Sequence, residues 1–165
     1  MNSSTPAEEI YSRWERFRSL LQEHLPQAEG AFVFSRLNTF YFTGTSANGI
    51  FWVPIEGDPI LFCRRGAERA AIETPLESIV PFSSYRDIEN TFGDLSISLP
   101  STIASEMNGL SWALSRSLTK NLPSIEFVPC DKLIAVTRAK KSEWELQILR
   151  EAGKKHDKCL TQLLP

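Results

Sequence analysis

The sequence of 165 residues has little of several residue types on which common functions depend. It contains only two histidines and three cysteines. The cysteines, Cys63, Cys130 and Cys159, are odd in number and far apart, which disfavours a disulfide framework and a cysteine-based zinc site and favours a reducing compartment. Neither His24 nor His156 has a partner at metal-ligand spacing, so the sequence predicts no metal site.

A large charge of one sign and a long apolar run are also missing. The 18 basic and 20 acidic side chains leave a net charge of -2, which argues against a nucleic-acid partner or an anionic membrane. No stretch approaches the roughly 18 apolar residues of a membrane helix. The first residues lack the basic and apolar regions of a secretion signal. We therefore expect a cytoplasmic protein with no nucleic-acid or membrane partner.

The apolar pattern that is present predicts short strands alternating with helices. A helical stripe follows Thr5, the expected N-cap, and Pro26 ends it. Gly57 suits a tight turn between two strands, which predicts an antiparallel hairpin. The sequence therefore predicts an α/β fold with a mixed β-sheet flanked by helices on both faces. The expected strands are residues 31–34, 40–42, 50–53, 60–63, 79–82, 102–105 and 125–128.

The last predicted helix starts at a clear signal and lacks a packing partner. Ser142 and Glu145 have the spacing of a capping box. The helix then continues to the last residues, and no later segment follows for its apolar stripe. We expect the sequence to be part of something longer, and the exposed stripe to cause self-association or fraying. The stripe ends with Leu149, Leu160, Leu163 and Leu164.

A search for catalytic groups finds no credible set. Residues 44–49 come near the nucleophile elbow G-x-S-x-G, but the closing glycine is one place late and a strand follows it. With so few histidines, a base for Ser46 is hard to supply. The simplest interpretation is a loop between two strands, and a hydrolase that uses Ser46 is a distant alternative. Glu106 follows a strand and is interpreted as a solvated or capping acid.

Three motifs in order resemble those of the creatinase/prolidase N-terminal domain, which precedes the pita-bread catalytic domain of Xaa-Pro peptidases. Residues 38–44 resemble N-x-x-Y-L-T-G, and residues 57–62 are similar to G-x-P-x-L-F. Residues 138–146 resemble R-x-x-K-S-x-x-E-I, the entry to the helix that joins the two domains. The resemblance implies a ribonuclease-H-like fold. It divides the chain into an N-terminal domain, residues 1–140, and the start of the linking helix, residues 141–165.

The resemblance also implies what this chain does not do by itself. In the family, two Asp, one His and two Glu hold two divalent metal ions, and all lie in the catalytic domain. The resemblance therefore implies no catalytic residue, metal ligand or cofactor in this chain, and a parent that is a dimetal Xaa-Pro hydrolase. The expected role is to support a homodimer and to restrict access to the active site. The partners are then the protein's own C-terminal catalytic domain, a second copy and, through the full-length protein only, a peptide substrate.

One loop is the expected point of contact with substrate. In some members the loop after Y-L-T-G reaches the neighbouring subunit's active site, which implies Thr45, Ser46 and Asn48 as substrate-access residues here. Creatinase-like members carry an arginine in that loop to hold a carboxylate. This loop has none, which favours a proline-directed peptidase. The alternative function is a protein-binding module of a catalytically inactive peptidase-like protein.

Overall fold

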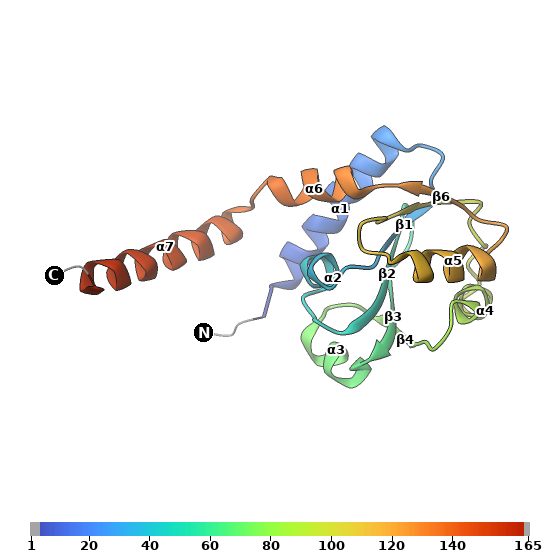
Figure 1. The fold of residues 1–165 in the computed structure, drawn as a ribbon, viewed down its shortest axis with the longest axis horizontal. Coiled ribbons are helices and arrows are strands. Elements are labelled where there is room, and N and C mark those ends of the chain that lie inside the picture. The colour runs from blue at the N-terminus through green and yellow to red at the C-terminus, as the bar shows by residue number, and fades with distance from the viewer. Residues whose placement is uncertain (1–3, 164–165) are drawn as a thin grey trace.

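The computed structural model describes residues 4–163 and shows a layered body from which one long helix projects (Figure 1). The body ends with helix α6 (Asp131–Ala139), and the projecting helix is α7 (Glu143–Leu163). Residues 140–142 connect these two helices.

One six-stranded sheet forms the middle of the body, in the order β4-β3-β2-β1-β5-β6. Strand β2 is antiparallel to β1 and to β3, whereas the β1–β5, β3–β4 and β5–β6 pairs are parallel. The predicted hairpin is confirmed, with Gly57 at a φ of 94° between β2 and β3. The sheet is therefore mixed, and its strands are β1 (Gly30–Val33), β2 (Asn48–Pro54), β3 (Ile60–Arg65), β4 (Ser78–Pro81), β5 (Thr102–Ser105) and β6 (Glu126–Pro129).

Helices cover both faces of the sheet, as predicted. Successive side chains of a strand point to opposite faces, so a strand that is apolar throughout supplies two cores. In β2, Phe51 and Val53 belong to the core under α1, α2, α3 and α6, while Ile50 and Trp52 belong to the core under α4 and α5. The remaining helices are α1 (Ala7–His24), α2 (Arg36–Thr43), α3 (Ala67–Glu73), α4 (Arg86–Asp94) and α5 (Trp112–Asn121).

The predicted strand at residues 40–42 is wrong, because this segment lies in helix α2. Two local signals override its aromatic and β-branched composition. The Ser35 hydroxyl accepts a hydrogen bond from the Asn38 N–H at 3.3 Å, which caps the start of the helix. Gly44 ends the helix in the left-handed region at a φ of 76°. Residues 44–47 consequently connect a helix to a strand, and the interpretation as a loop between two strands is wrong.

Of the two predicted helix caps, the one at the first helix is absent and the one at the last helix is present. Helix α1 has Pro6 at its N-cap without a side-chain cap, so the predicted Thr5 cap is wrong. The predicted capping box of α7 is confirmed. The Ser142 N–H donates to Glu145 Oε2 at 2.9 Å, and the Glu145 N–H donates to Ser142 Oγ at 3.1 Å.

Beyond its first turn, α7 makes little contact with the body. Leu149 is 53% exposed and Leu160 is 46% exposed, so the unsupported apolar stripe is present where the structure describes it. Leu164 and the side chain of Leu163 lie outside the described residues. The helix therefore presents its apolar side chains to solvent.

Candidate functional site

The predicted access loop lies at the edge of the sheet where β1, β3, β4 and β5 have their carboxyl ends. The loop leaves α2 at Gly44 and enters β2 at Asn48. A register shift between β2 and β3 occurs at residues 48 and 49. A Cβ atom on Gly49 would lie 1.9 Å from the carbonyl oxygen of Phe62, so this close approach requires glycine.

The three predicted loop residues have different surroundings. Thr45 is fully buried, and its hydroxyl donates to Glu73 Oε2 at 2.7 Å. Ser46 is partly exposed, and its hydroxyl accepts a hydrogen bond from the Arg69 guanidinium. Asn48 is exposed. The first two side chains are therefore tied to α3, whereas the Asn48 side chain forms no hydrogen bond with the described residues.

The arrangement around Ser46 offers no activated nucleophile. Its hydroxyl is bound to an arginine, which has no proton-accepting nitrogen at neutral pH. Helix α7, which carries His156, projects away from the body (Figure 1), and His24 lies at the end of α1. Among the hydrogen bonds of residues 4–163, none joins a histidine to Ser46. Nothing in this geometry supports the serine hydrolase alternative.

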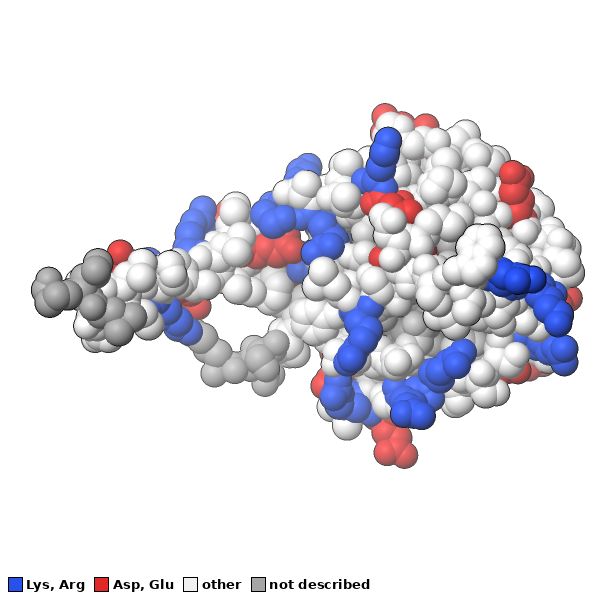
Figure 2. Space-filling view, viewed as in Figure 1, with Lys and Arg blue, Asp and Glu red and all other residues white. Residues whose placement is uncertain are grey.

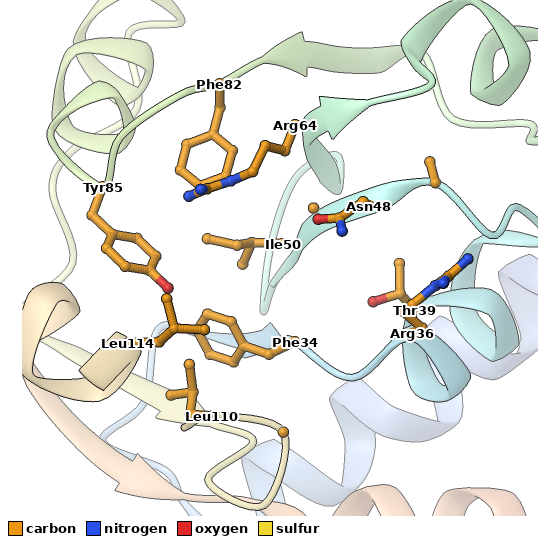
Figure 3. A pocket seen from close by; sticks show the side chains of 13 residues that line it. Phe34, Arg36, Thr39, Asn48, Ile50, Arg64, Phe82, Tyr85, Leu110 and Leu114 are labelled. Atoms are coloured by element: carbon orange, nitrogen blue, oxygen red, sulfur yellow. The ribbon is translucent and has the colours of Figure 1, made fainter. Parts of the chain in front are cut away.

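A pocket of about 340 Å³ opens beside the loop (Figure 3). Asn48 and Ile50 of β2 border it, together with groups that follow the carboxyl ends of β1, β4 and β5. Ligands of α/β proteins bind preferentially at such an edge of the sheet. The apolar walls of the pocket are Phe34, Ile50, Phe82, Leu110 and Leu114.

The polar groups of the pocket are cationic or neutral. Arg64 and Arg36 line it, and none of its lining residues is acidic. The Arg64 guanidinium lies 4.8 Å from the centre of the Phe82 ring. Burial raises the pKa of the Tyr85 hydroxyl, while the nearby charge of Arg64 opposes that rise. On the same face of the molecule, basic side chains gather over α2, α3 and the end of β3 (Figure 2).

Asp87, whose carboxylate is close enough to Arg64 to be affected by its charge, already has hydrogen-bond donors. The Asp87 carboxylate accepts hydrogen bonds from the N–H groups of Ser83 and Ser84, both at 2.8 Å. These bonds lower the pKa of Asp87, and Arg64 contributes weakly in the same direction. Arg64 itself forms no salt bridge within residues 4–163. Its charge is therefore available to a ligand.

Glu106, the residue directly after β5, is buried at this edge of the sheet. Glu106 is 3% exposed and accepts hydrogen bonds from the Phe34 N–H at 2.7 Å, the Ser35 N–H at 2.8 Å and the Asn38 amide at 2.6 Å. Arg138 donates in turn to Asn38 Oδ1 at 3.0 Å. Of the two predicted roles of Glu106, the solvated acid is wrong, and the capping acid is confirmed, because its carboxylate accepts N–H groups at the start of α2. The position after an apolar strand was the only signal in the sequence.

The donors of this chain do not fit a dimetal centre. Within residues 4–163, no three His, Cys, Asp or Glu side chains are grouped so as to hold a metal ion. The buried acids are also occupied, Glu9 by Arg13 and Glu106 by backbone N–H groups. No helix in the described part of the chain has the length and apolar character needed to cross a membrane.

Comparison with solved structures defines the class of fold. The chain superposes on an Xaa-Pro dipeptidase from Bacillus anthracis with a TM-score of 0.79 at 19% identity, covering 94% of this chain and 43% of the other. It also resembles the N-terminal domain of the cytoplasmic peptidase PepQ from Mycobacterium tuberculosis, with a TM-score of 0.62 at 17% identity, covering 76% of this chain and 98% of that domain. The fold is therefore that of the N-terminal α/β domains of prolidase-type proteins.

Sequence comparison places the chain in a family. The creatinase/prolidase N-terminal domain matches residues 13–140, and the chain belongs to this family. An uncharacterized peptidase of Staphylococcus haemolyticus is 29% identical over 154 residues, which are 90% of this chain and 42% of the relative. The chain thus spans less than half the length of the curated relatives it matches.

Proposed function

We propose that this chain is the non-catalytic N-terminal domain of an Xaa-Pro dipeptidase or aminopeptidase-like metallopeptidase. The observation that carries the proposal is the family match over residues 13–140 combined with coverage of only 42% of the relatives. In this proposal residues 1–140 are the domain and residues 141–165 begin the helix that links it to the catalytic domain. The two divalent metal ions belong to that second domain.

The domain is proposed to restrict access to the active site through the loop of Thr45, Ser46 and Asn48. Thr45 serves as the internal anchor, because its buried hydroxyl is held by Glu73. Ser46 and Asn48 are the members at the surface. Only Asn48 has a side chain free of hydrogen bonds to the described residues, so it is the member expected to touch a peptide.

The domain is also proposed to support assembly, as a homodimer and with the catalytic domain. A groove of about 420 Å³ lies between α2 and the start of α7. The large apolar side chains along it are exposed: Leu37 by 61%, Phe40 by 45%, Ile148 by 46% and Leu149 by 53%. Apolar groups gathered in this way favour contact with another protein surface.

The location proposed for the parent protein is the cytoplasm. The small number of cysteines supports this, since disulfides accumulate in oxidising compartments. Neither a nucleic-acid partner nor a membrane partner is proposed, because the net charge is only -2.

The decisive experiment examines the coding sequence after Pro165 and the longer protein that it encodes. We expect a second domain with two Asp, one His and two Glu ligands. The longer protein, loaded with a divalent metal such as Mn²⁺, should hydrolyse Xaa-Pro dipeptides, and the 165-residue chain should not. A second domain without these ligands would support the protein-binding module instead. A stop codon directly after Pro165 would contradict both proposals.

The access loop has its own test in the longer protein. Asn48→Ala should raise KM for peptide substrates by about two- to tenfold, the value of one lost hydrogen bond. Asn90→Ala, at an exposed position on α4, is the matched control and should leave KM unchanged. Equal KM values for the three proteins would refute the role of Asn48.

A further inference from the structure

The pocket beside the access loop is lined by two arginines, Arg36 and Arg64, by neutral polar side chains and by apolar walls. We propose that it binds a small carboxylic acid that carries an apolar side chain and an amide. In this arrangement Arg64 pairs with the carboxylate, and the apolar side chain lies against Phe34, Ile50 and Leu114 (Figure 3). The inference goes beyond the proposed function, because the site lies within this chain and requires no catalytic domain.

The charge of the pocket selects an anion. No lining residue is acidic, and Arg64 makes no salt bridge with the described residues. Its guanidinium is held against the Phe82 ring, which restricts its motion and leaves its N–H groups free to donate. Arginine donates to a carboxylate through two parallel hydrogen bonds, a geometry that gives orientation as well as affinity.

The pocket is also lined by a buried hydroxyl that has no hydrogen-bond partner among the described residues. Thr39 is 1% exposed, and its Oγ1 atom has no hydrogen-bond partner among residues 4–163. A buried polar atom without a partner is destabilising, and a polar group of a ligand that reaches it would supply the missing hydrogen bond. The oxygen of Thr39 points toward the Phe34 side of the pocket, and the Asn48 amide also points inward (Figure 3). These two groups suit the amide of the ligand.

The walls of the pocket favour an organic body over inorganic phosphate. Aromatic and aliphatic side chains surround the polar groups, and Tyr85, on the side of the pocket opposite Thr39, points its hydroxyl inward toward Leu114 (Figure 3). A volume of about 340 Å³ is enough for a small organic ligand. Phosphate would leave the apolar walls without contacts, and it would meet only one arginine at a time, because Arg64 lies beside Phe82 and Arg36 lies at the other end beside Thr39 (Figure 3).

The proposal is tested by titrating the 165-residue chain and following its amide signals by NMR. The probes are N-acetylleucine, its neutral counterpart N-acetylleucinamide, and inorganic phosphate. N-acetylleucine should shift the signals of residues that line the pocket and should bind about tenfold or more tightly than the amide, since the pairing is charge-assisted. No binding of N-acetylleucine, equal binding of the amide, or binding of phosphate alone would overturn the proposal.

Two variants separate a specific site from general attraction to basic side chains. Arg64→Gln should weaken N-acetylleucine binding by about tenfold or more. Arg65→Gln is the matched control, because Arg65 is the next residue of β3, is exposed and does not line the pocket. Thr39→Val should also weaken binding while the chain keeps its fold. An equal loss for Arg64→Gln and Arg65→Gln would overturn the proposal. The peptidase assay of the longer protein is a separate measurement, so failure of one proposal does not decide the other.

Discussion

Replacing Arg13 is the most informative perturbation of this fold, because one buried side chain joins α1, α2 and α7. Arg13 is 3% exposed. Its guanidinium donates to Glu9 Oε1 at 2.8 Å, to the carbonyl oxygen of Tyr41 at 2.6 Å and to Glu145 Oε1 at 3.2 Å. It also lies 4.1 Å from the centre of the Tyr41 ring. The variant Arg13→Met keeps the length of the side chain and removes the charge.

The expected cost of Arg13→Met is about 3–5 kcal/mol, the range for removing one partner of a buried ion pair. The cause is the pair of carboxylates that remain, since the side chains of Glu9 and Glu145 are only 8% and 13% exposed. At a slope of about 2 kcal/mol per molar urea, the unfolding midpoint should fall by about 2 M. Because Glu145 also belongs to the capping box, amides at the start of α7 should exchange faster with solvent.

Urea unfolding followed by circular dichroism measures this effect. Arg116→Met, at an exposed position of α5 that forms no salt bridge with residues 4–163, is the control and should change the free energy of unfolding by less than about 0.5 kcal/mol. Adding Glu9→Gln to Arg13→Met should cost less than the sum of the two single changes. A cost below about 1 kcal/mol for Arg13→Met, or strict additivity, would refute the reasoning.

Three further predictions concern backbone space, acid stability and thiol reactivity. Gly49→Ala should lower the free energy of unfolding by about 2 kcal/mol or more, because the new Cβ would overlap a carbonyl of β3. Gly93→Ala in α4 has open space and should be neutral or stabilise the fold by up to about 1 kcal/mol. The reverse order of stability in urea unfolding would contradict this. The lowered pKa of Asp87 stabilises the fold above its unfolded value of about 3.8, and this contribution is lost as the pH falls through the lower folded value. Asp87→Asn should therefore flatten the dependence of unfolding free energy on pH between about 5 and 2, and an unchanged profile would argue against it. Burial raises the pKa of the Cys130 thiol, so iodoacetamide should modify the exposed Cys159 first and Cys130 only after the chain unfolds. Mass spectrometry measures this order, and rapid modification of Cys130 in the folded chain would contradict the prediction.

Much of the architecture could be predicted because its signals are local. The apolar runs of β1 and β2 indicate strands covered on both faces, and Gly57 indicates the turn that makes the sheet mixed. The capping box of Ser142 and Glu145 indicates the start of α7. Each signal depends on neighbours within a few residues, so it survives without knowledge of the tertiary structure.

In helix α2, residue composition and local capping signals favour different structures. The aromatic residues Phe40, Tyr41 and Phe42 favour a strand by composition. The Ser35 cap and the left-handed Gly44 support a helix, which buries Tyr41 and Phe42 against α1 and leaves Phe40 exposed. Packing decides such cases, since strand propensity describes a half-buried pleated surface that this segment never joins.

The sequence by itself determined the family, the alternation of strands and helices, and the absence of a recognisable catalytic motif, since these follow from residue order and short-range spacing. Only the tertiary structure decided that Glu106 is buried against the start of α2, that Thr45 is an anchor, and that Arg64 and Thr39 line one pocket. These residues come from segments far apart in the chain. Their burial and hydrogen bonding depend on which strand ends the sheet brings together, and no local pattern encodes that.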